Sequence, residues 1–353
     1  MLKDILKELT QLYGPPGHEK YLVDSISKLF SKYCDEVKVD KLFNVIGLKR
    51  ANPDKEAAFK VMIAAHVDEI AMMVTEIDKK GFIKFAPVGG IDPRILLSQE
   101  VIIHSRKEVY GVIGAKPPHL ISEEEKKKAV SVEDFYIDTG MSENEAKDII
   151  DIGDTITFKP YWSELQNEFV SSKSLDNRAG VASMIGILEE IKHLKHEVDI
   201  ICVATSQEEV GLRGALVSAY GINPDAAIVI DGCHGDMPGL DKEETYTLGK
   251  GPAIAIGPNI QPELAEYLKQ VAKCENIPYQ IDVEPGNTGT DAWGIQVSRS
   301  GIPTVLVSIP LRYMHSTVET ISIVDLKNTS RLVAHFLKRL DEKLEGMKCF
   351  LRN

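Results

Sequence analysis

Apolar segments that run directly into acidic or histidine residues constrain the fold of this chain more than any other feature. The clearest one covers residues 198–205, which are rich in Val and Ile and lack Gly and Pro, and it is followed by Glu208 and Glu209. Such a segment is typical of a strand buried on both faces of a mostly parallel sheet. Side chains that follow these strands lie at the carboxyl edge of the sheet, where open α/β sheets bind their ligands. The sequence therefore predicts an α/β fold with its chemistry at that edge.

The same arrangement recurs elsewhere in the chain. Apolar residues 59–65 precede a His, residues 226–230 precede an Asp, and the strand-like residues 304–309 lead to a second His. Each residue taken alone has a simpler explanation: a lone His after a strand is most often structural, Asp176 could cap the helix expected at 181–193, and a Glu pair could open a solvated helix. The candidate metal ligands are His66, Asp176, Glu209, Asp231 and His315.

These nitrogen and oxygen donors, without a cysteine among them, suit zinc, cobalt or manganese. If Asp176 bridges with both of its oxygens, two ions would each have one His, the shared Asp and one further carboxylate, with a position left for water or substrate. Two ions about 3.5–4 Å apart polarise a carbonyl and lower the pKa of a water between them. Glu208 is adjacent to the ligand Glu209 and would accept the proton of that water and pass it to the leaving nitrogen.

Composition narrows the class of partners. With 353 residues the chain exceeds the roughly 100–200 of one domain, so we expect a large domain with a smaller companion. A net charge of −12 and the lack of a basic stripe argue against nucleic acid or an anionic membrane as the main partner. The chain starts with an amphipathic pattern, and no apolar run reaches the roughly 18 residues that span a bilayer. We therefore expect a cytoplasmic enzyme, with free thiols because the cysteines are scattered.

Residues 70–161 differ in pattern from the rest of the chain. They contain short β-like pieces with Gly and Pro at the turns, and long helical patterns are scarce. This composition predicts a small β-rich domain or barrel inserted in the larger domain. We place the insert at residues 70–164 and the catalytic domain at residues 1–69 and 165–353.

Short motifs spread over almost the whole chain carry the candidate residues. They are Ala64-Ala65-His66-Val67-Asp68, Leu175-Asp176-Asn177-Arg178, Gln207-Glu208-Glu209-Val210-Gly211, Ile230-Asp231, Gly289-Thr290-Asp291 and Arg312-Tyr313-Met314-His315-Ser316. Together these motifs resemble those of the M42 metallo-aminopeptidases, also called tetrahedral aminopeptidases, a family that has relatives described as cellulases.

The resemblance implies a role for each candidate residue. His66 and Asp231 would bind one ion, Glu209 and His315 the other, and Asp176 both. Glu208 would be the general base, and Asp68 would support the site. The resemblance also implies two divalent ions per subunit, zinc or cobalt, and a cis peptide between Asp176 and Asn177.

The resemblance extends to fold and assembly. It implies a phosphorylase/hydrolase-like catalytic domain with a mixed sheet flanked by helices, and a PDZ-like β-barrel insert that serves in dimerisation. Dimers of this kind would join into a tetrahedral dodecamer with interior active sites, which admits short peptides and excludes folded proteins. Whether this chain stops at the dimer or forms the dodecamer is left open by the sequence.

We expect a cytoplasmic aminopeptidase that removes N-terminal residues from short peptides. One alternative is a glycoside hydrolase of the endo-β-glucanase type, in which a pair of acids flanks the glycosidic bond; the ligand histidines argue against it. The other is an inactive assembly protein of the same fold, and the complete set of ligands and base argues against that. The preferred N-terminal side chain stays open among acidic, aliphatic and basic.

The segment after Asp231 departs from the family pattern. The family usually has a Val-Thr pair there, whereas this chain has Gly232-Cys233-His234. The local wall of the site is therefore in question, and His234 is a candidate for an extra ligand.

Overall fold

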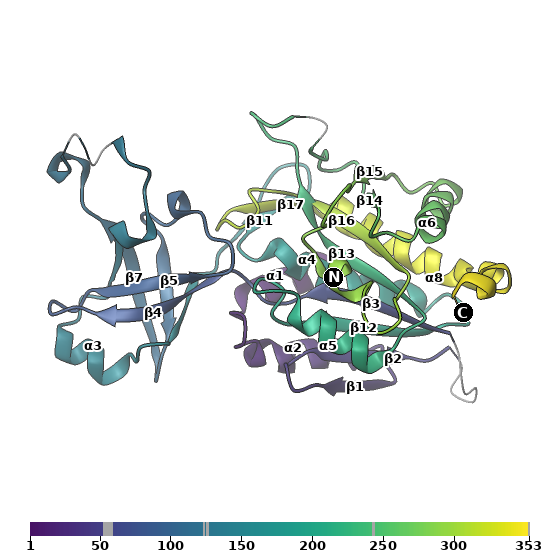
Figure 1. Cartoon of the computed structure of the whole chain (residues 1–353), viewed down its shortest axis with the longest axis horizontal. Coiled ribbons are helices and arrows are strands. Elements are labelled where there is room, and N and C mark those ends of the chain that lie inside the picture. Colours follow the sequence, from purple (N-terminus) through teal and green to yellow (C-terminus); the bar gives the residue numbers. More distant parts are fainter. Residues whose placement is uncertain (52–58, 123, 125–126, 242–243, 352–353) are drawn as a thin grey trace.

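The structure consists of a large α/β domain and a smaller β-barrel beside it (Figure 1). It is a computed structural model, and it describes residues 1–51, 59–122, 124, 127–241 and 244–351. The chain leaves the large sheet after His66, builds the barrel, and returns to the large sheet at Trp162. The α/β fold with an inserted barrel that the sequence predicted is thus confirmed.

The large domain is built on one mixed sheet, which has eleven strands within the described residues. The order along the main path is β1 (Glu36–Val39), β2 (Val45–Lys49), β12 (Asp199–Thr205), β3 (Lys60–His66), β13 (Ala226–His234), β16 (Thr304–Arg312), β17 (Glu319–Ser322), β11 (Phe169–Ser172) and β10 (Trp162–Glu164). Two further strands, β14 (Ala253–Ile256) and β15 (Gln280–Val283), join through β16. Strand β10, inside the range expected for the insert, pairs with β11 of this sheet.

The four central strands, β12, β3, β13 and β16, are parallel. Every residue of β12 is buried, as is expected for a Val- and Ile-rich strand with helices on both faces. Thr205 pairs in register with His66, and Asp231 pairs with Ser308. The carboxyl ends of these strands therefore lie along one edge of the sheet, as the sequence predicted.

Helices cover the sheet. In the large domain they are α1 (Leu2–Gln11), α2 (Lys20–Phe30), α4 (Leu175–Ile191), α5 (Arg213–Ile222), α6 (Pro262–Cys274), α7 (Asp291–Ile295) and α8 (Ile323–Leu351). Helix α4 is apolar around most of its circumference because it packs against the sheet on one side and against α1 and α8 on the other. At Gly186 a Cβ would lie 2.4 Å from Oγ of Ser330, so only glycine allows α4 and α8 to approach this closely.

The insert is a closed barrel with a core of its own. Its strands follow the order β4 (Ala71–Ile77), β5 (Ile83–Val88), β8 (Phe135–Asp138), β7 (Glu108–Ala115), β6 (Glu100–His104) and β9 (Thr155–Phe158). One helix, α3 (Glu143–Ile149), packs against β4, and short 3₁₀ turns occur at Pro93–Ile95, Pro118–Leu120 and Val132–Asp134. Among the described residues, no helix combines the length and the apolar character needed to cross a membrane.

Candidate metal centre and active site

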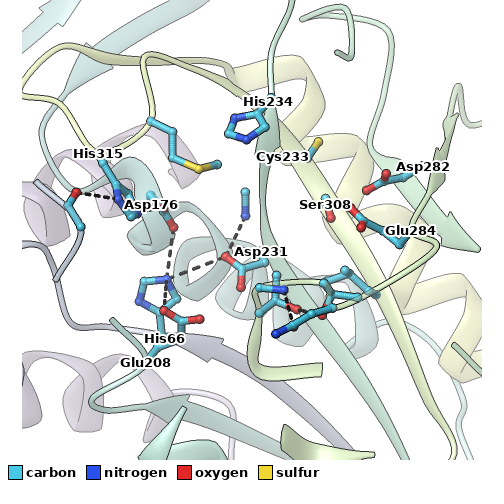
Figure 2. A pocket seen from close by; sticks show the side chains of 18 of the residues that line it. His66, Asp176, Glu208, Asp231, Cys233, His234, Asp282, Glu284, Ser308 and His315 are labelled. Atoms are coloured by element: carbon cyan, nitrogen blue, oxygen red, sulfur yellow. Dashed lines mark hydrogen bonds and ion pairs between the residues drawn. The ribbon is translucent and has the colours of Figure 1, made fainter. Parts of the chain in front are cut away.

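The carboxyl ends of the central strands and the start of one helix bring the predicted ligands together (Figure 2). His66 is the last residue of β3, Asp231 lies near the end of β13, and the Glu208–Glu209 pair directly follows β12. The remaining two are Asp176, in the first turn of α4, and His315, in the loop after β16. The structure therefore gathers all five predicted ligands and the predicted base in one place.

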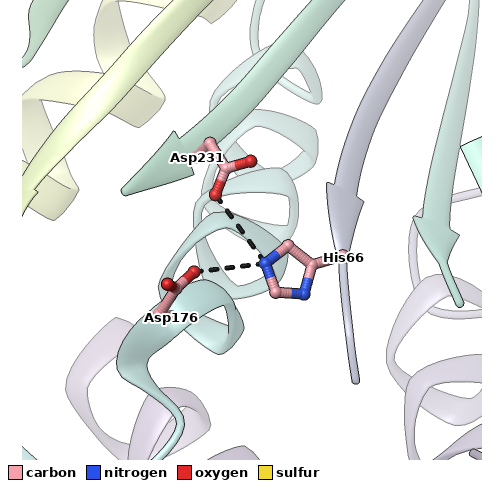
Figure 3. A group of neighbouring side chains, drawn as sticks. All are labelled: His66, Asp176 and Asp231. Carbon is pink, nitrogen blue, oxygen red and sulfur yellow. Dashed lines mark hydrogen bonds and ion pairs between the residues drawn. The ribbon is translucent and has the colours of Figure 1, made fainter. Parts of the chain in front are cut away.

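One group consists of His66, Asp176 and Asp231, all three buried (Figure 3). The Nε2 atom of His66 lies 3.1 Å from Oδ1 of Asp176 and 3.8 Å from Oδ1 of Asp231. The three residues can each direct one ligand atom to a common point, since those atoms lie within 4.8 Å of one another.

A second group consists of Asp176, Glu209 and His315. The Nε2 atom of His315 lies 3.4 Å from Oε1 of Glu209 and 3.5 Å from Oδ2 of Asp176. Asp176 thus faces His66 with one carboxylate oxygen and His315 with the other. Glu208 converges with His66 and Glu209 in a third group, and its Oε2 is 4.0 Å from Nε2 of His66.

The charges of this cluster suit bound cations. Burial, reinforced by neighbouring carboxylates, raises the pKa of Glu209 to about 7, that of Glu208 to about 10 and that of Asp231 well above its usual range. Burial also disfavours the charge on Asp176, but His315 and His66 outweigh it and lower the pKa of that carboxyl. Carboxyl groups crowded in this way resist ionising together, and a bound divalent cation would reverse the shifts by stabilising their charged forms. Nitrogen and oxygen donors of this kind fit such ions.

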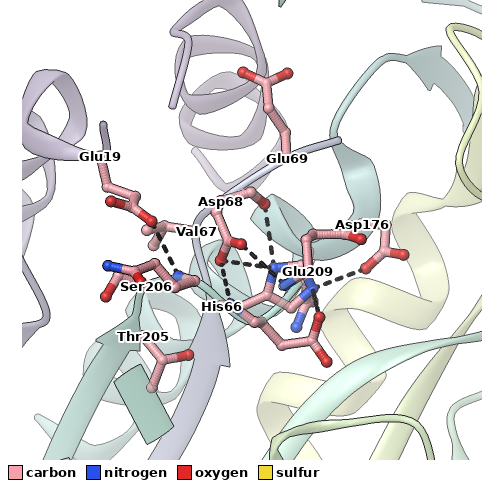
Figure 4. A network of polar contacts seen from close by, with 12 residues as sticks. Glu19, His66, Val67, Asp68, Glu69, Asp176, Thr205, Ser206 and Glu209 are labelled. Atoms are coloured by element: carbon pink, nitrogen blue, oxygen red, sulfur yellow. Dashed lines mark hydrogen bonds and ion pairs between the residues drawn. The ribbon is translucent and has the colours of Figure 1, made fainter. Parts of the chain in front are cut away.

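Asp68 orients both the glutamate pair and His66 (Figure 4). Its two carboxylate oxygens accept hydrogen bonds of 3.0 Å from the main-chain N–H groups of Glu208 and Glu209. Its main-chain oxygen lies 3.2 Å from Nδ1 of His66, which directs Nε2 of that ring toward the cluster. One residue earlier in the loop, the N–H of Gln207 donates to Oε1 of buried Glu19 at 3.0 Å.

Glu319 and Gly90 also hold the cluster, and sequence reasoning missed both. Glu319 accepts hydrogen bonds from the main-chain N–H groups of Asp176, at 3.0 Å, and His315, at 2.9 Å. The carbonyl oxygen of Gly90, which follows strand β5 of the barrel, lies 2.9 Å from Nδ1 of His315. No local pattern marks either residue, because the strand that Glu319 begins, β17, has the sequence Glu-Thr-Ile-Ser, and Gly90 lies in the loop after β5.

The peptide bond between Asp176 and Asn177 is cis, as the family resemblance implied. The side-chain amide of Asn177 donates to the main-chain oxygen of Ile230 at 2.8 Å, and this contact joins the start of α4 to β13. The two elements that supply Asp176 and Asp231 are therefore linked directly.

The cluster opens into a cavity of about 820 Å³. Gly232 lies at its wall, where a Cβ would be 3.2 Å from Cε of Met314 and 3.8 Å from Oδ1 of Asp176. His234 also lines the cavity, but among the described residues it belongs to none of the groups whose ligand atoms converge (Figure 2).

Comparison with known proteins identifies relatives over nearly the whole chain. The family model described as M42 glutamyl aminopeptidase matches residues 44–332. A lysyl aminopeptidase of Pyrococcus furiosus is 36% identical over 342 residues, which is 96% of this chain and 97% of the relative.

Solved structures agree with these matches. A TET aminopeptidase from a marine-sediment Thaumarchaeota archaeon has 35% identity and a TM-score of 0.92, with 98% of each chain covered. The TET1 peptidase of Pyrococcus horikoshii has 32% identity and a TM-score of 0.82, with 96% of this chain and 99% of that chain covered. It is described as able to assemble into a tetrahedron or a large octahedral shell.

Proposed function

The chain belongs to the M42 aminopeptidase family, and on that premise we propose that it hydrolyses the N-terminal residue from short peptides with two divalent metal ions bound around Asp176. His66 and Asp231 would hold one ion, Glu209 and His315 would hold the other, and Asp176 would serve both. The observation that carries this assignment is the position of Asp176, whose two carboxylate oxygens face different histidines. Zinc and cobalt both suit the donor set.

When bound, the two ions would supply Lewis acidity, which polarises the scissile carbonyl and lowers the pKa of a water molecule. Glu208 would accept a proton from that water and return it to the leaving nitrogen, since its carboxylate borders the cluster and converges with His66 and Glu209 but not with Asp176. Asp68 keeps Glu208 and Glu209 pointed in their separate directions through its two main-chain contacts. Gly90 and Glu319 restrict the ring and the backbone of His315.

The geometry disfavours glycoside hydrolysis. The two acids of a glycosidase flank the bond at about 5–9.5 Å and act without metal. Here Asp176 and Glu209 direct oxygens to within 4.8 Å of one another and of a histidine nitrogen. Such crowding suits a shared cation better than a sugar ring between two acids.

Hydrolysis of aminoacyl p-nitroanilides before and after chelation tests the proposal. We expect activity to disappear in chelator, to return with zinc or cobalt, and to be absent from the same substrates when their amine is acetylated. Equal hydrolysis of acetylated substrates would contradict an aminopeptidase. Hydrolysis of a β-glucan instead would favour the glycosidase, and a metal-restored protein inactive on every substrate would favour the assembly protein.

The relatives' assembly leads us to propose a homo-oligomer, in which the barrel forms dimers and the dimers join into a tetrahedral dodecamer. Exposed apolar side chains support contacts between copies, since monomeric surfaces rarely gather many of them. Helices α5 and α7 pack against each other, and exposed apolar side chains lie on both and just after α7. These side chains are Leu216, Val217, Tyr220, Trp293 and Val297.

A further inference from the structure

The cavity at the metal cluster has a second acidic region, away from the proposed ligands. Asp282 and Glu284, at the end of β15, line it together with Glu244 (Figure 2). Asp282 and Glu284 lie on the opposite side of the view from His66 and Asp176. The mechanism proposed above gives these acids no role.

The register of the sheet places Asp282 on the same face as the proposed ligand Asp231. Asp231 on β13 pairs with Ser308 on β16, Ser308 with Ala253 on β14, and Ala253 with Gln280 on β15. Residues directly opposite one another share a face, and so do residues two apart in one strand. Asp282, two residues after Gln280, therefore points to the side of the sheet where the cluster lies.

Asp282 is held in place, and the basic group that acts on it from the cavity lining is His234, which lowers the pKa of Asp282 less than burial raises it. It is 3% exposed, and its Oδ1 accepts a hydrogen bond of 2.5 Å from the hydroxyl of Tyr246. Its other close polar neighbour is Glu284, itself an acid; burial, and after it the charge of Asp282, raises the pKa of Glu284 to about 7. Among the described residues that line the cavity there is no Lys or Arg. Two carboxyl groups in contact inside a cavity are the arrangement that a ligand's cation would stabilise.

The distance from the cluster decides which part of a substrate can reach these acids. Strand β15 lies three strand spacings from β13, roughly 14 Å. With its carbonyl at the metal cluster, the first residue of a peptide has its α-amine only two covalent bonds from the carbonyl carbon, too close to reach Asp282. Its side chain is the group that can extend across the cavity.

A long side chain with an apolar stem fits that path. Side chains of Asp231 and of Asp282 stand on the same face of the sheet, so the span between them lies over that face, and a lysine side chain adds roughly 6 Å between Cα and Nζ. Leu212, Leu306 and Met314 line the same cavity and offer apolar surface to methylene groups.

From these observations we propose that Asp282 and Glu284 bind the side chain of the N-terminal residue and make the enzyme selective for Lys and Arg at that position. The proposal rests on the proposed aminopeptidase function and names its substrate class. The family description names glutamate instead, and a glutamate side chain would be repelled by this end of the cavity.

The test compares kcat/KM of the metal-restored enzyme for Lys, Arg, Leu and Glu p-nitroanilides. We expect Lys and Arg to exceed Leu and Glu by about 10- to 100-fold, the range for a hydrogen-bonded charged group.

In Glu284→Gln and Asp282→Asn, the Lys and Arg values should fall toward that of Leu, while the Leu value stays within about twofold. Asn keeps an oxygen for the Tyr246 hydroxyl, so Asp282→Asn should fold normally. Glu263→Gln, on the exposed first turn of α6, is the matched control and should change nothing.

Dipeptides distinguish the first residue from the second. If Glu284→Gln and Asp282→Asn lose hydrolysis of Lys-Leu and keep that of Leu-Lys, the proposal is supported. If they lose hydrolysis of Leu-Lys alone, the acids contact the leaving residue and the proposal is overturned. A wild-type preference for Leu or Glu would also overturn it and leave the aminopeptidase function standing. Failure to hydrolyse any aminoacyl substrate would reject both. As an independent readout, free lysine should inhibit more strongly than free leucine in the wild type but not in Glu284→Gln.

Discussion

Glu208 and Glu209 are adjacent but face different groups, so removing each carboxylate should have a different effect. Glu209→Gln should lower metal content after dialysis, and excess zinc or cobalt should restore part of the lost activity. Glu208→Gln removes no proposed ligand, so metal content should stay normal while turnover falls by about 10²–10⁴-fold, and added metal should not help. Metal analysis and turnover with and without added metal measure both. The reverse pattern would exchange the two roles, and normal turnover in both variants would reject the site.

Glu19 should make stability depend on pH. Burial raises the pKa of this carboxyl from 4.5 to about 7, and its Oε2 has no hydrogen-bond partner. The folded state therefore binds more protons than the unfolded state between these values, so stability is highest below the lower pKa and decreases as pH rises toward 7. Glu19→Gln cannot ionise, and between pH 5 and 8 it should lose less stability than the wild type, by on the order of 2–3 kcal/mol. Urea unfolding at several pH values measures the difference, and parallel curves would contradict it.

Single residues also show how far the sequence could predict the site. The proposed ligands follow apolar strands or precede a helix, and those local signals were enough to select residues that the structure brings together. Glu319 reaches Asp176, and Gly90 reaches His315, only through tertiary packing across 143 and 225 residues of sequence. Local periodicity carries no information about such contacts. The sequence left the preferred N-terminal side chain open for the same reason. Asp282 and Asp231 come to the same face of the sheet only through the register of four strands.

Among the elements, the clarity of the apolar pattern decided which could be predicted. The apolar segments at 59–65 and 198–205 form the strands β3 and β12, whereas α4 begins at Leu175, ahead of the expected start at residue 181. The short elements β8, β14, β17 and α7 had no clear pattern, since four or five residues cannot distinguish one period from another. Their positions depend on neighbouring strands, and register with β16 is what brings β14 and β15 to the cavity.

The turn after β5 connects the barrel to the metal centre, and Gly90→Ala tests that link. An added Cβ would lie 2.9 Å from Nδ1 of His315, so the ring must shift from its present position beside Glu209. We expect kcat/KM and metal affinity to fall by about 10–100-fold, as for other contacts that orient a ligand, with little change in melting temperature. Gly221→Ala in α5, where a Cβ meets nothing within 4 Å, is the matched control. Unchanged metal affinity in Gly90→Ala would mean that the barrel does not hold His315.

At the scale of the whole molecule, the barrel has its own closed sheet and core but also supplies Gly90 to the catalytic domain. Assembly and catalysis should therefore be connected if the barrel joins two copies. A cytoplasmic location stays a prediction of composition alone.

The proposed closed shell predicts a particle of twelve copies of the 39.1 kDa chain, about 470 kDa, in light scattering. Replacing an exposed apolar residue of α5 with a charge, as in Val217→Glu, should reduce the particle to smaller species if this face joins the copies, because a charge buried in such a contact is costly. Those species should still hydrolyse aminoacyl p-nitroanilides, since Val217 is not among the residues lining the cavity. They should also degrade an unfolded protein chain faster than the intact shell, whose interior admits only short peptides. A wild-type protein that is a fully active monomer at dilute concentration would rule out the shell, and it would leave the metal centre and its chemistry as proposed.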